Sequence, residues 1–257
     1  GRNPNYVKYY YSGNRQYLLN YTYDALGNVL TITYPNSGTI VKYSYDDDNR
    51  VTQVAVRLAG AGSDTILANQ ITYLPNGPLA SLHFGDGSVE TRTYDNSYRL
   101  TGLTDVNGTT TLRILSYGYN AHDNLTSISD LLSAANNQTF TYSPRELLAT
   151  AVGPFANLAY TYDGVGNRLT QSVGAATESY AYPGSSNRLS SITSASTPAR
   201  TLTHNAIGNV TTDNRGGNIY TYVYDAADRI RQVKLNGVIQ ANYTYNYRGQ
   251  QITRGFP

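Results

Sequence analysis

One short unit, YTYDGVGNRLT at residues 160–170, recurs along the whole chain and constrains the fold more than any other feature. Tyr160 and Tyr162 lie two residues apart, so in a strand both side chains point to one face. Asp163 suits the first position of a turn because its carboxylate can accept a hydrogen bond from the backbone two residues on. Gly166 suits the left-handed position that closes such a turn. The unit therefore predicts a strand, a tight turn and a returning strand.

The unit occurs eleven times at spacings of 20 to 28 residues, which indicates a repeat architecture. Tyr73 with Gly77 is a further copy, weaker copies start at Tyr142 and Tyr182, and one copy has His204 in place of the tyrosine. We expect the recurring residues to be a structural signature rather than a catalytic or ligand-binding set. The signature residues are Tyr23, Asp24, Gly27, Tyr45, Asp46, Tyr94, Asp95, Tyr119, Tyr162, Asp163, Gly166, Gly208, Tyr224, Asp225, Tyr245 and Gly249.

The residue that closes each turn varies between copies. In three copies the glycine is replaced by types that tolerate left-handed geometry, namely Asn49, Asp123 and Asp228. Three other copies carry residues that do not fit this rule, namely Tyr98, Glu146 and Ser186. The sequence therefore predicts a different turn type or length at those three positions.

The second half of each unit supplies another strand and another turn. Apolar and threonine residues follow the first turn, and hairpin dipeptides then occur, as at Asp86-Gly87, Asn107-Gly108 and Asn236-Gly237. About twenty-two short strands joined by short turns pair as antiparallel neighbours, and an open twisted sheet rarely exceeds ~10 strands without curling or splitting. The predicted fold is all-β: tandem antiparallel β-hairpin repeats in a long curled sheet, a spiral or partial barrel. Residues 1–257 form a single segment in this prediction, with an incomplete first repeat.

Apolar residues three positions apart could instead mark a helical stripe. The pairs are Val51/Val54, Leu100/Leu103, Leu189/Ile192 and Ile230/Val233. They persist for less than two helical turns, which is too short for a stable helix, so a strand with both faces partly buried, or with a bulge, is favoured. A helical turn or longer loop is predicted within residues 131–138, and an irregular hairpin extension over residues 57–69.

Three copies of the unit, YTYDALGNVL, YTYDGVGNRL and YVYDAADRI, resemble the YD repeats of Rhs proteins. The same repeats occur in the BC components of Tc toxins and in teneurins, and the resemblance covers essentially the whole chain. It implies a long β-ribbon that spirals into a hollow shell. In bacterial members the shell encloses a C-terminal toxic domain, whereas in teneurins it serves cell adhesion. The resemblance also implies a secreted or cell-surface protein, and in bacteria a role in competition.

The chain departs from the family pattern after Gly249. It lacks the Asp- and Pro-rich segment that closes the bacterial shell and carries aspartates for self-cleavage, and no toxin domain follows. Residues 1–4 contain neither an initiator Met nor a signal sequence. We therefore expect an excised part of a shell wall, and we assign self-cleavage to no residue.

The composition argues against several other classes of function. The 19 basic residues are scattered among 17 acidic ones, so a nucleic-acid partner is not expected. The lack of cysteine excludes disulfides and thiolate metal sites. No apolar run approaches the ~20 residues that span a bilayer as a helix. The length of 257 residues is enough for a sizeable core.

Candidate residues for chemistry are few. Asp46, Asp47 and Asp48 could offer oxygen ligands to a calcium ion, but Asp46 is a repeat aspartate, which favours a solvated turn. No Gly-x-Ser-x-Gly elbow is present. The histidines lie on different repeats, at His83, His122 and His204. The sequence therefore predicts a protein that is not an enzyme and has no cofactor and no metal site.

The 26 tyrosines leave two functions open. Tyrosine beside Asn and Asp resembles the lining of carbohydrate sites, but a cross-strand aromatic ladder worth ~0.2–1 kcal/mol per pair accounts for the same pattern. The leading hypothesis is a shell segment that encapsulates or presents a polypeptide toxin. The alternative is an extracellular adhesion or carbohydrate-binding module. The expected partners are a toxin domain or the rest of the shell, a second copy joined through free sheet edges, or glycans.

Overall fold

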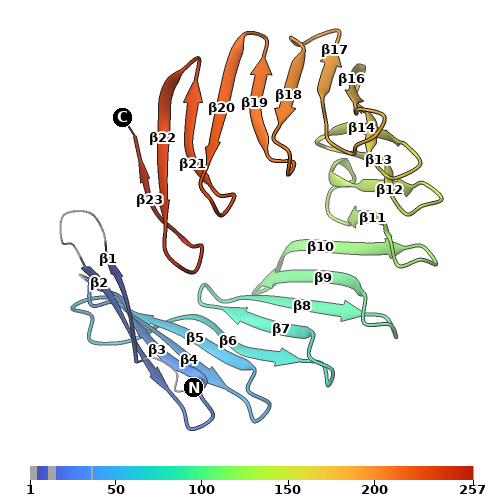
Figure 1. The fold of residues 1–257 in the computed structure, drawn as a ribbon. Helices are drawn as coiled ribbons and strands as arrows, with labels where there is room; N and C mark the ends of the chain where they lie inside the picture. The colour runs from blue at the N-terminus through green and yellow to red at the C-terminus, as the bar shows by residue number, and fades with distance from the viewer. Residues whose placement is uncertain (1–4, 11–15, 36, 257) are drawn as a thin grey trace. The chain divides into compact units, whose positions relative to one another are not determined.

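The structure is a computed structural model that describes residues 5–10, 16–35 and 37–256. Residues 1–4, on which the expectation of an excised segment partly rested, lie outside this part. The described chain contains twenty-three strands and one short 3-10 helix (Figure 1). It forms two compact units, the first from Gly1–Asn120 with Leu125–Asn137 and the second from Ala121–Asn124 with Gln138–Pro257.

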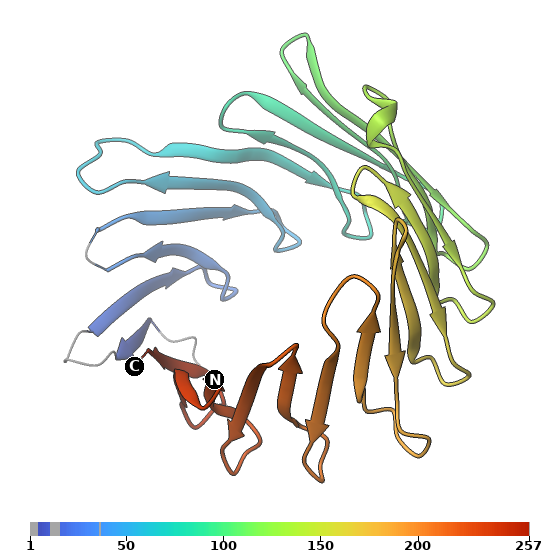
Figure 2. The same cartoon turned by 90° about the horizontal axis from the view of Figure 1, so that it is seen from above.

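The first unit is a ribbon of antiparallel strands in chain order (Figure 2). Each strand from β1 to β10 pairs with the strand that follows it. The strands are β1 Tyr6–Tyr10, β2 Gln16–Tyr23, β3 Val29–Thr33, β4 Ile40–Tyr45, β5 Val51–Arg57, β6 Thr65–Tyr73, β7 Leu79–Phe84, β8 Ser88–Tyr94, β9 Leu100–Asn107, β10 Thr110–Tyr119 and β11 Leu125–Asp130. The 3-10 helix η1 spans Ala134–Asn136, so the helical turn predicted within residues 131–138 is confirmed.

The second unit repeats the same arrangement. Each strand from β12 to β22 pairs antiparallel with the next. The strands are β12 Gln138–Tyr142, β13 Leu148–Gly153, β14 Ala156–Tyr162, β15 Arg168–Val173, β16 Ala176–Ala181, β17 Ser191–Ser194, β18 Arg200–His204, β19 Val210–Arg215, β20 Asn218–Tyr224, β21 Ile230–Leu235, β22 Val238–Tyr245 and β23 Gln251–Gly255. The predicted all-β fold of tandem antiparallel hairpins is confirmed.

A β-bulge follows the first turn of the repeat in ten hairpins. In β14 and β15, Tyr162 lies opposite Arg168 and Thr161 lies opposite Thr170, so Leu169 is the extra residue. The bulge explains the apolar residues three positions apart. Val51 faces Tyr45 and Val54 faces Tyr43, so the valines share one face of the sheet although their spacing is helical. The predicted bulge is confirmed there.

The turn predictions at Tyr98 and Glu146 are wrong. Tyr98 has φ 59° and Glu146 has φ 60°, close to the 63° of Asn49 in the ordinary turn. Their backbone N–H groups also make the ordinary closing bonds, to the carbonyls of Asp95 and Ser143 at 3.0 Å each. The hydrogen bonds around the first turn residue therefore fix this geometry, and the surrounding hairpin offsets a left-handed cost of ~1–2 kcal/mol.

At Ser186 the prediction of a different turn is confirmed. β16 ends at Ala181 and β17 begins at Ser191, which leaves a nine-residue loop, 182–190. In an ordinary turn the first residue donates its backbone N–H to the carbonyl of the fifth, as Asp163 does to Asn167. Pro183 stands at this first position and has no N–H to donate, so this bond is missing.

The irregular extension predicted over residues 57–69 is too long. β6 already begins at Thr65, and Ile66 pairs with Ala55, so only residues 58–64 form the loop. Asp64 anchors this loop by accepting hydrogen bonds from Lys42 and Arg57, each at 2.7 Å. These ion pairs hold the end of the loop against the sheet, so β6 begins earlier than the Gly and Ala content of the segment suggested.

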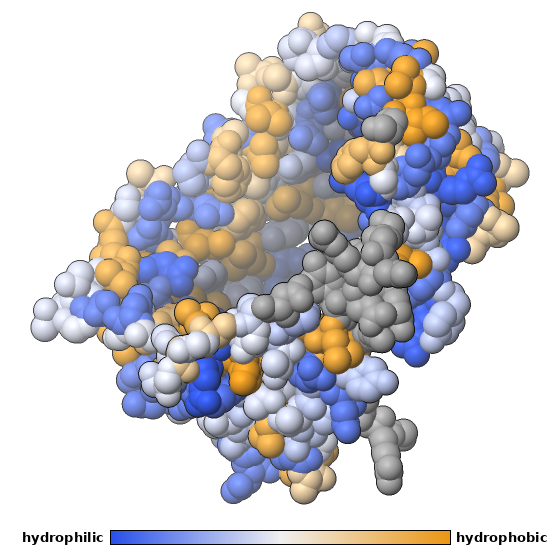
Figure 3. Space-filling model, turned by 90° about the vertical axis from the view of Figure 1, so that its left-hand side faces the viewer, coloured by the Kyte–Doolittle hydropathy of each residue, from blue (hydrophilic) through white to orange (hydrophobic). Residues whose placement is uncertain are grey.

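The chain is long enough for a sizeable core, but few of its apolar side chains are buried within either unit. The buried apolar residues of the described chain are five: Ala55, Leu103, Ala151, Tyr180 and Ala241. Figure 3 shows apolar residues spread among polar ones on the visible surface instead of gathered in one patch. A ribbon one sheet thick exposes both faces, so each side chain is shielded mainly by its neighbours on the adjacent strands.

The repeat turn offers a matched test of its backbone geometry. Gly166 has φ +96°, and a Cβ added there would lie 3.8 Å from Leu147 Cδ1, whereas Gly164 in the same turn lacks positive φ and a Cβ added there would meet nothing within 4 Å. We expect Gly166→Ala to lower the free energy of unfolding by about 1–2 kcal/mol, and Gly164→Ala to leave it unchanged or slightly higher. Equal losses in urea denaturation would contradict the assigned turn.

Candidate functional site

The face of the sheet that carries the YD tyrosines, here called the tyrosine face, is the candidate functional surface. In the first unit it includes Tyr43 and Tyr45, which lie opposite Val54 and Val51. The other face of the ribbon carries hydroxyl pairs between adjacent strands, such as Thr161 with Thr170 at 2.6 Å. The same pairing occurs at Thr22–Thr31, Thr72–Ser81, Thr93–Thr101, Thr141–Thr150, Thr203–Thr212 and Thr244–Thr253. One face is therefore aromatic and the other is polar.

In eight repeats a tyrosine hydroxyl links the hairpin to the one before it, in addition to the backbone pairing of adjacent strands. The hydroxyl of Tyr162 donates to the carbonyl of Leu148, the first residue of β13, at 2.8 Å. The same bond, at 2.7 to 3.1 Å, is made by Tyr45 to Val29, Tyr73 to Val51, Tyr94 to Leu79, Tyr119 to Leu100, Tyr182 to Arg168, Tyr224 to Val210 and Tyr245 to Ile230. Desolvation raises the pKa of Tyr162 and Tyr224, so these hydroxyls stay protonated and able to donate.

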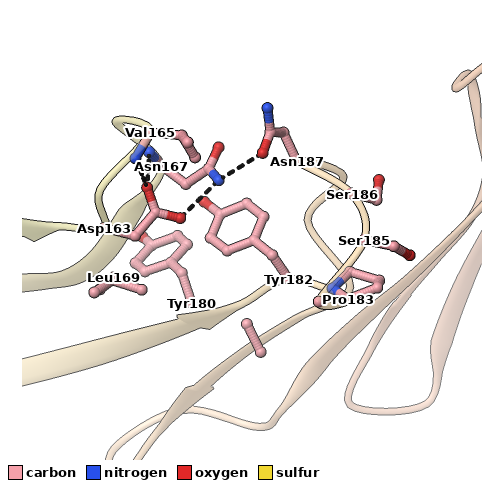
Figure 4. A pocket seen from close by; sticks show the side chains of 12 residues that line it. Asp163, Val165, Asn167, Leu169, Tyr180, Tyr182, Pro183, Ser185, Ser186 and Asn187 are labelled. Carbon is pink, nitrogen blue, oxygen red and sulfur yellow. Dashed lines mark hydrogen bonds between the residues drawn. The ribbon is translucent and has the colours of Figure 1, made fainter.

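The repeat aspartate holds the turn with both carboxylate oxygens. Asp163 Oδ1 accepts the backbone N–H groups of Val165 and Asn167, each at 2.9 Å, and Oδ2 accepts Asn167 Nδ2 at 2.8 Å (Figure 4). Asp24, Asp46, Asp95 and Asp225 make the same set of bonds. At Asp225 the side-chain hydrogen bond from Arg229, followed by the backbone one, lowers the carboxyl pKa.

The fifth residue of each turn, which the sequence analysis did not single out, links successive turns. Arg50 Nε donates to Asp46 at 2.8 Å, Nη1 donates to the carbonyl of Leu74 at 3.4 Å, and the guanidinium lies 5.0 Å from the Tyr73 ring centre. Arg99 and Arg229 make the same three contacts with their own neighbours.

Asparagine makes a shorter link at the same position. Asn28 Nδ2 donates to Asn49 at 2.7 Å, and Asn167 Nδ2 donates to Asn187 at 3.0 Å (Figure 4). The recurrence of Arg or Asn five residues after the YD tyrosine in most copies was the signal that could have revealed these links. Successive turns therefore form a hydrogen-bonded row along one edge of the ribbon within each unit.

The signature residues lie where strand meets turn in every copy. The tyrosines end their strands, the aspartates open the turns, and Gly27, Gly166, Gly208 and Gly249 have φ between 79° and 103°. The candidate residues for chemistry do not converge. Arg50 pairs with Asp46 at 2.8 Å and with Asp48 at 3.0 Å, so this acidic cluster is occupied by a guanidinium.

The histidines also lie apart. His204 is opposite Val210 on β19, and His122 is 3.7 Å from Glu146 in another turn. Within the described residues, no group of three or more His, Asp or Glu side chains is placed to hold a metal ion. None of the helical structure in this part of the chain is long and apolar enough to cross a membrane.

A groove of about 670 Å³ opens between the turn 163–167 and the nine-residue loop after β16. Tyr180, Tyr182 and Asn187 are among its lining residues, and Figure 4 shows the two rings beside the polar groups of Asp163 and Asn167. The groove lies beside the loop that departs from the repeat. The sequence analysis named the tyrosine pattern but not this position.

Comparison with known proteins supports the repeat assignment. Residues 23–60 match a family described as RHS Repeat. No curated protein matches the sequence.

Similar folds occur in solved Tc toxin structures. One is the Photorhabdus luminescens Tc holotoxin pore with a TccC3 mutation, at 16% identity and TM-score 0.61, covering 94% of this chain and 18% of that one. Others are TcdB2-TccC3-Cdc42, at 19% and 0.64 with coverage of 90% and 14%, and TcdB2-TccC3 without its hypervariable C-terminal region, at 15% and 0.61 with coverage of 95% and 18%. The resemblance to Rhs-type YD repeats is confirmed, although the chain spans less than a fifth of each of these relatives.

The link between hairpins can be tested by removing one hydroxyl. We expect Tyr162→Phe to lower the free energy of unfolding by about 1 kcal/mol, because the carbonyl of Leu148 loses its bond to the tyrosine hydroxyl. Tyr160→Phe, on the same strand and the same face, is the control because the Tyr160 hydroxyl makes no hydrogen bond to the described residues. Urea denaturation measures both variants. A control as destabilised as Tyr162→Phe would show that the loss does not come from this bond.

The turns that open with an aspartate should lose protection against amide hydrogen exchange at low pH. The folded-state pKa of Asp225 lies below its ordinary 3.8, so its stabilisation is complete above that value and is lost as the pH falls through the lowered pKa. The amide protection factor of Arg229, which donates to Asp225, should therefore drop at low pH. Gln250 donates to the uncharged Asn246 in a matching turn, so its protection should hold. Parallel loss at both amides would rule out titration of Asp225 as the cause.

Proposed function

We propose that this chain is a wall segment of an Rhs-type shell that encapsulates or presents a polypeptide. The observation that carries the proposal is the succession of antiparallel hairpins, eight of which are bonded through a tyrosine hydroxyl to the hairpin before them. Such a ribbon extends by adding repeats, and its faces stay largely exposed in each unit. The fold shared with the TccC3-containing complexes supports the same role.

The proposed role is structural and not catalytic, with residues 1–257 acting as one wall segment. Its partner would be a polypeptide, either an enclosed toxin domain or further parts of the shell. β23 pairs with β22 alone in the described part of the chain, so its other edge offers backbone groups for such pairing. A secreted or cell-surface location and a role in bacterial competition belong to the same proposal.

A carbohydrate-binding role is the second candidate, and the groove beside loop 182–190 favours it. Tyr180 and Tyr182 offer aromatic rings there, and Asn187 and Ser186 offer amide and hydroxyl groups. Sugars bind to sites that combine flat apolar faces with a few polar groups of this kind. This combination of aromatic and polar groups is confined to one groove, whereas the contacts between repeats extend through both units. The shell is therefore the better-supported function.

Limited proteolysis of the protein, expressed with whatever its reading frame encodes on either side, tests the shell. We expect mass spectrometry to find a polypeptide outside the hairpins that resists protease until the sheet is unfolded. A glycan array tests the second candidate, with Asn187→Ala as the groove variant. Saturable sugar binding, together with complete digestion of all polypeptide outside the hairpins, would overturn the shell in favour of the carbohydrate module.

A further inference from the structure

A second groove, of about 400 Å³, lies on the tyrosine face of the second unit and gathers three arginines. Arg168 comes from β15, Arg200 from β18 and Arg215 from β19. Tyr180 and Ile192, which lie opposite each other on β16 and β17, fill the space between these arginines. The register of five successive strands therefore brings the three guanidinium groups to one place.

A buried carboxylate orients two of these arginines. Asp213 is 1% exposed, and its oxygens accept Nε and Nη2 of Arg200 at 2.7 Å each. Asp213 Oδ2 also accepts Nε and Nη2 of Arg215 at 2.9 and 2.8 Å. Despite desolvation, the side-chain bonds from both arginines lower the pKa of Asp213, so this carboxylate stays charged. The Arg200 and Arg215 side chains remain 36% and 49% exposed, and neither Nη1 group makes a hydrogen bond within the described chain, although the Arg215 guanidinium lies 4.8 Å from the Tyr220 ring centre.

The third arginine is held by an aromatic ring. The Arg168 guanidinium lies 4.2 Å from the ring centre of Tyr180, and it makes no ion pair within the described chain. The hydroxyl of Tyr180 bonds Glu178 at 2.6 Å, and this environment raises the Tyr180 pKa to about 12 through desolvation first and the Glu178 bond second. Glu178 accepts the hydrogen bond of the tyrosine hydroxyl through Oε2 and forms no ion pair with Arg168, and the guanidinium donors of Arg168 make no hydrogen bond within the described chain.

The arginines of this groove outnumber the carboxylates that face them, so its charges do not cancel. Its three arginines face two carboxylates, Glu178 and Asp213, which leaves an excess of one positive charge. In the first unit, a similar cluster on β8 to β10 pairs two arginines with two carboxylates and has no excess: Arg92, Arg113, Glu90 and Asp105. The second cluster thus lacks one anionic group.

We propose that this groove binds a carboxylate side chain of a polypeptide. Guanidinium groups bind carboxylates through paired N–H donors, and one carboxylate matches the single excess charge. A phosphate group, at about −1.5 to −2, would exceed it. The proposal extends the proposed function, because it names the kind of side chain that an enclosed polypeptide would present to the wall.

The test titrates the purified chain with a blocked tetraglutamate peptide while the arginine Nε–H signals are followed by NMR. We expect the signals of Arg168, Arg200 and Arg215 to shift together and saturate. Arg168→Gln, which leaves both Asp213 pairs intact, should weaken binding about tenfold, the loss of one charge-assisted bond. Arg231→Gln removes an equal charge at an exposed position on β21 and should leave binding unchanged.

Three results would overturn the assignment. The first is that a blocked tetraglutamine peptide produces the same shifts. The second is that Arg168→Gln binds tetraglutamate as tightly as the native chain does. The third is that inorganic phosphate shifts the same arginine signals with a higher affinity than tetraglutamate. Circular dichroism of each variant confirms that the sheet is intact before affinities are compared. Because free peptides are used, loss of protease protection in the shell test and loss of binding here are separate outcomes.

Discussion

The bond from a YD tyrosine hydroxyl to a backbone carbonyl of the preceding hairpin, made in eight repeats, is the interaction on which the rest of the structure depends. In the returning strand that supplies the acceptor, the residue after the acceptor is the bulge residue, as Ala149 follows Leu148. The same ring lies along the sheet and shields the strands beneath it. Tyrosine meets both needs, whereas phenylalanine would cover the sheet without adding this hydroxyl link to the strand pairing. This accounts for tyrosine in place of phenylalanine at the eight linking positions.

A ribbon joined in this way needs no central core. Hairpins contact their neighbours through strand pairing, tyrosine hydroxyls and the hydrogen-bonded row of turns. The stability of the ribbon is then approximately the sum of the contributions from these nearest-neighbour contacts. Both faces then remain available for contact with other polypeptide. The groove with the three arginines interrupts the aromatic surface with a net charge, and it is the place on the described ribbon that best distinguishes one partner from another.

The sequence predicted the parts of the fold that depend on local preference. Asp163 and Gly166 indicated the turn, and the tyrosine spacing indicated the strand. It failed at Tyr98, because the bonds to Asp95 decide that geometry more strongly than the residue's own preference. The links between turns escaped prediction because the partners are far apart, as Arg50 and Leu74 are by 24 residues. The groove escaped it too, since strand register and not spacing brings its arginines together.

Hydrogen exchange of a Tyr224→Ala variant tests the central claim most directly. If stability passes from hairpin to hairpin, protection should fall most in β18 to β21, which flank the lost bond to Val210, and recover with each repeat toward β12. A uniform loss of protection across all strands from β12 to β23 would contradict the account, because it would show that the unit shares one cooperative core.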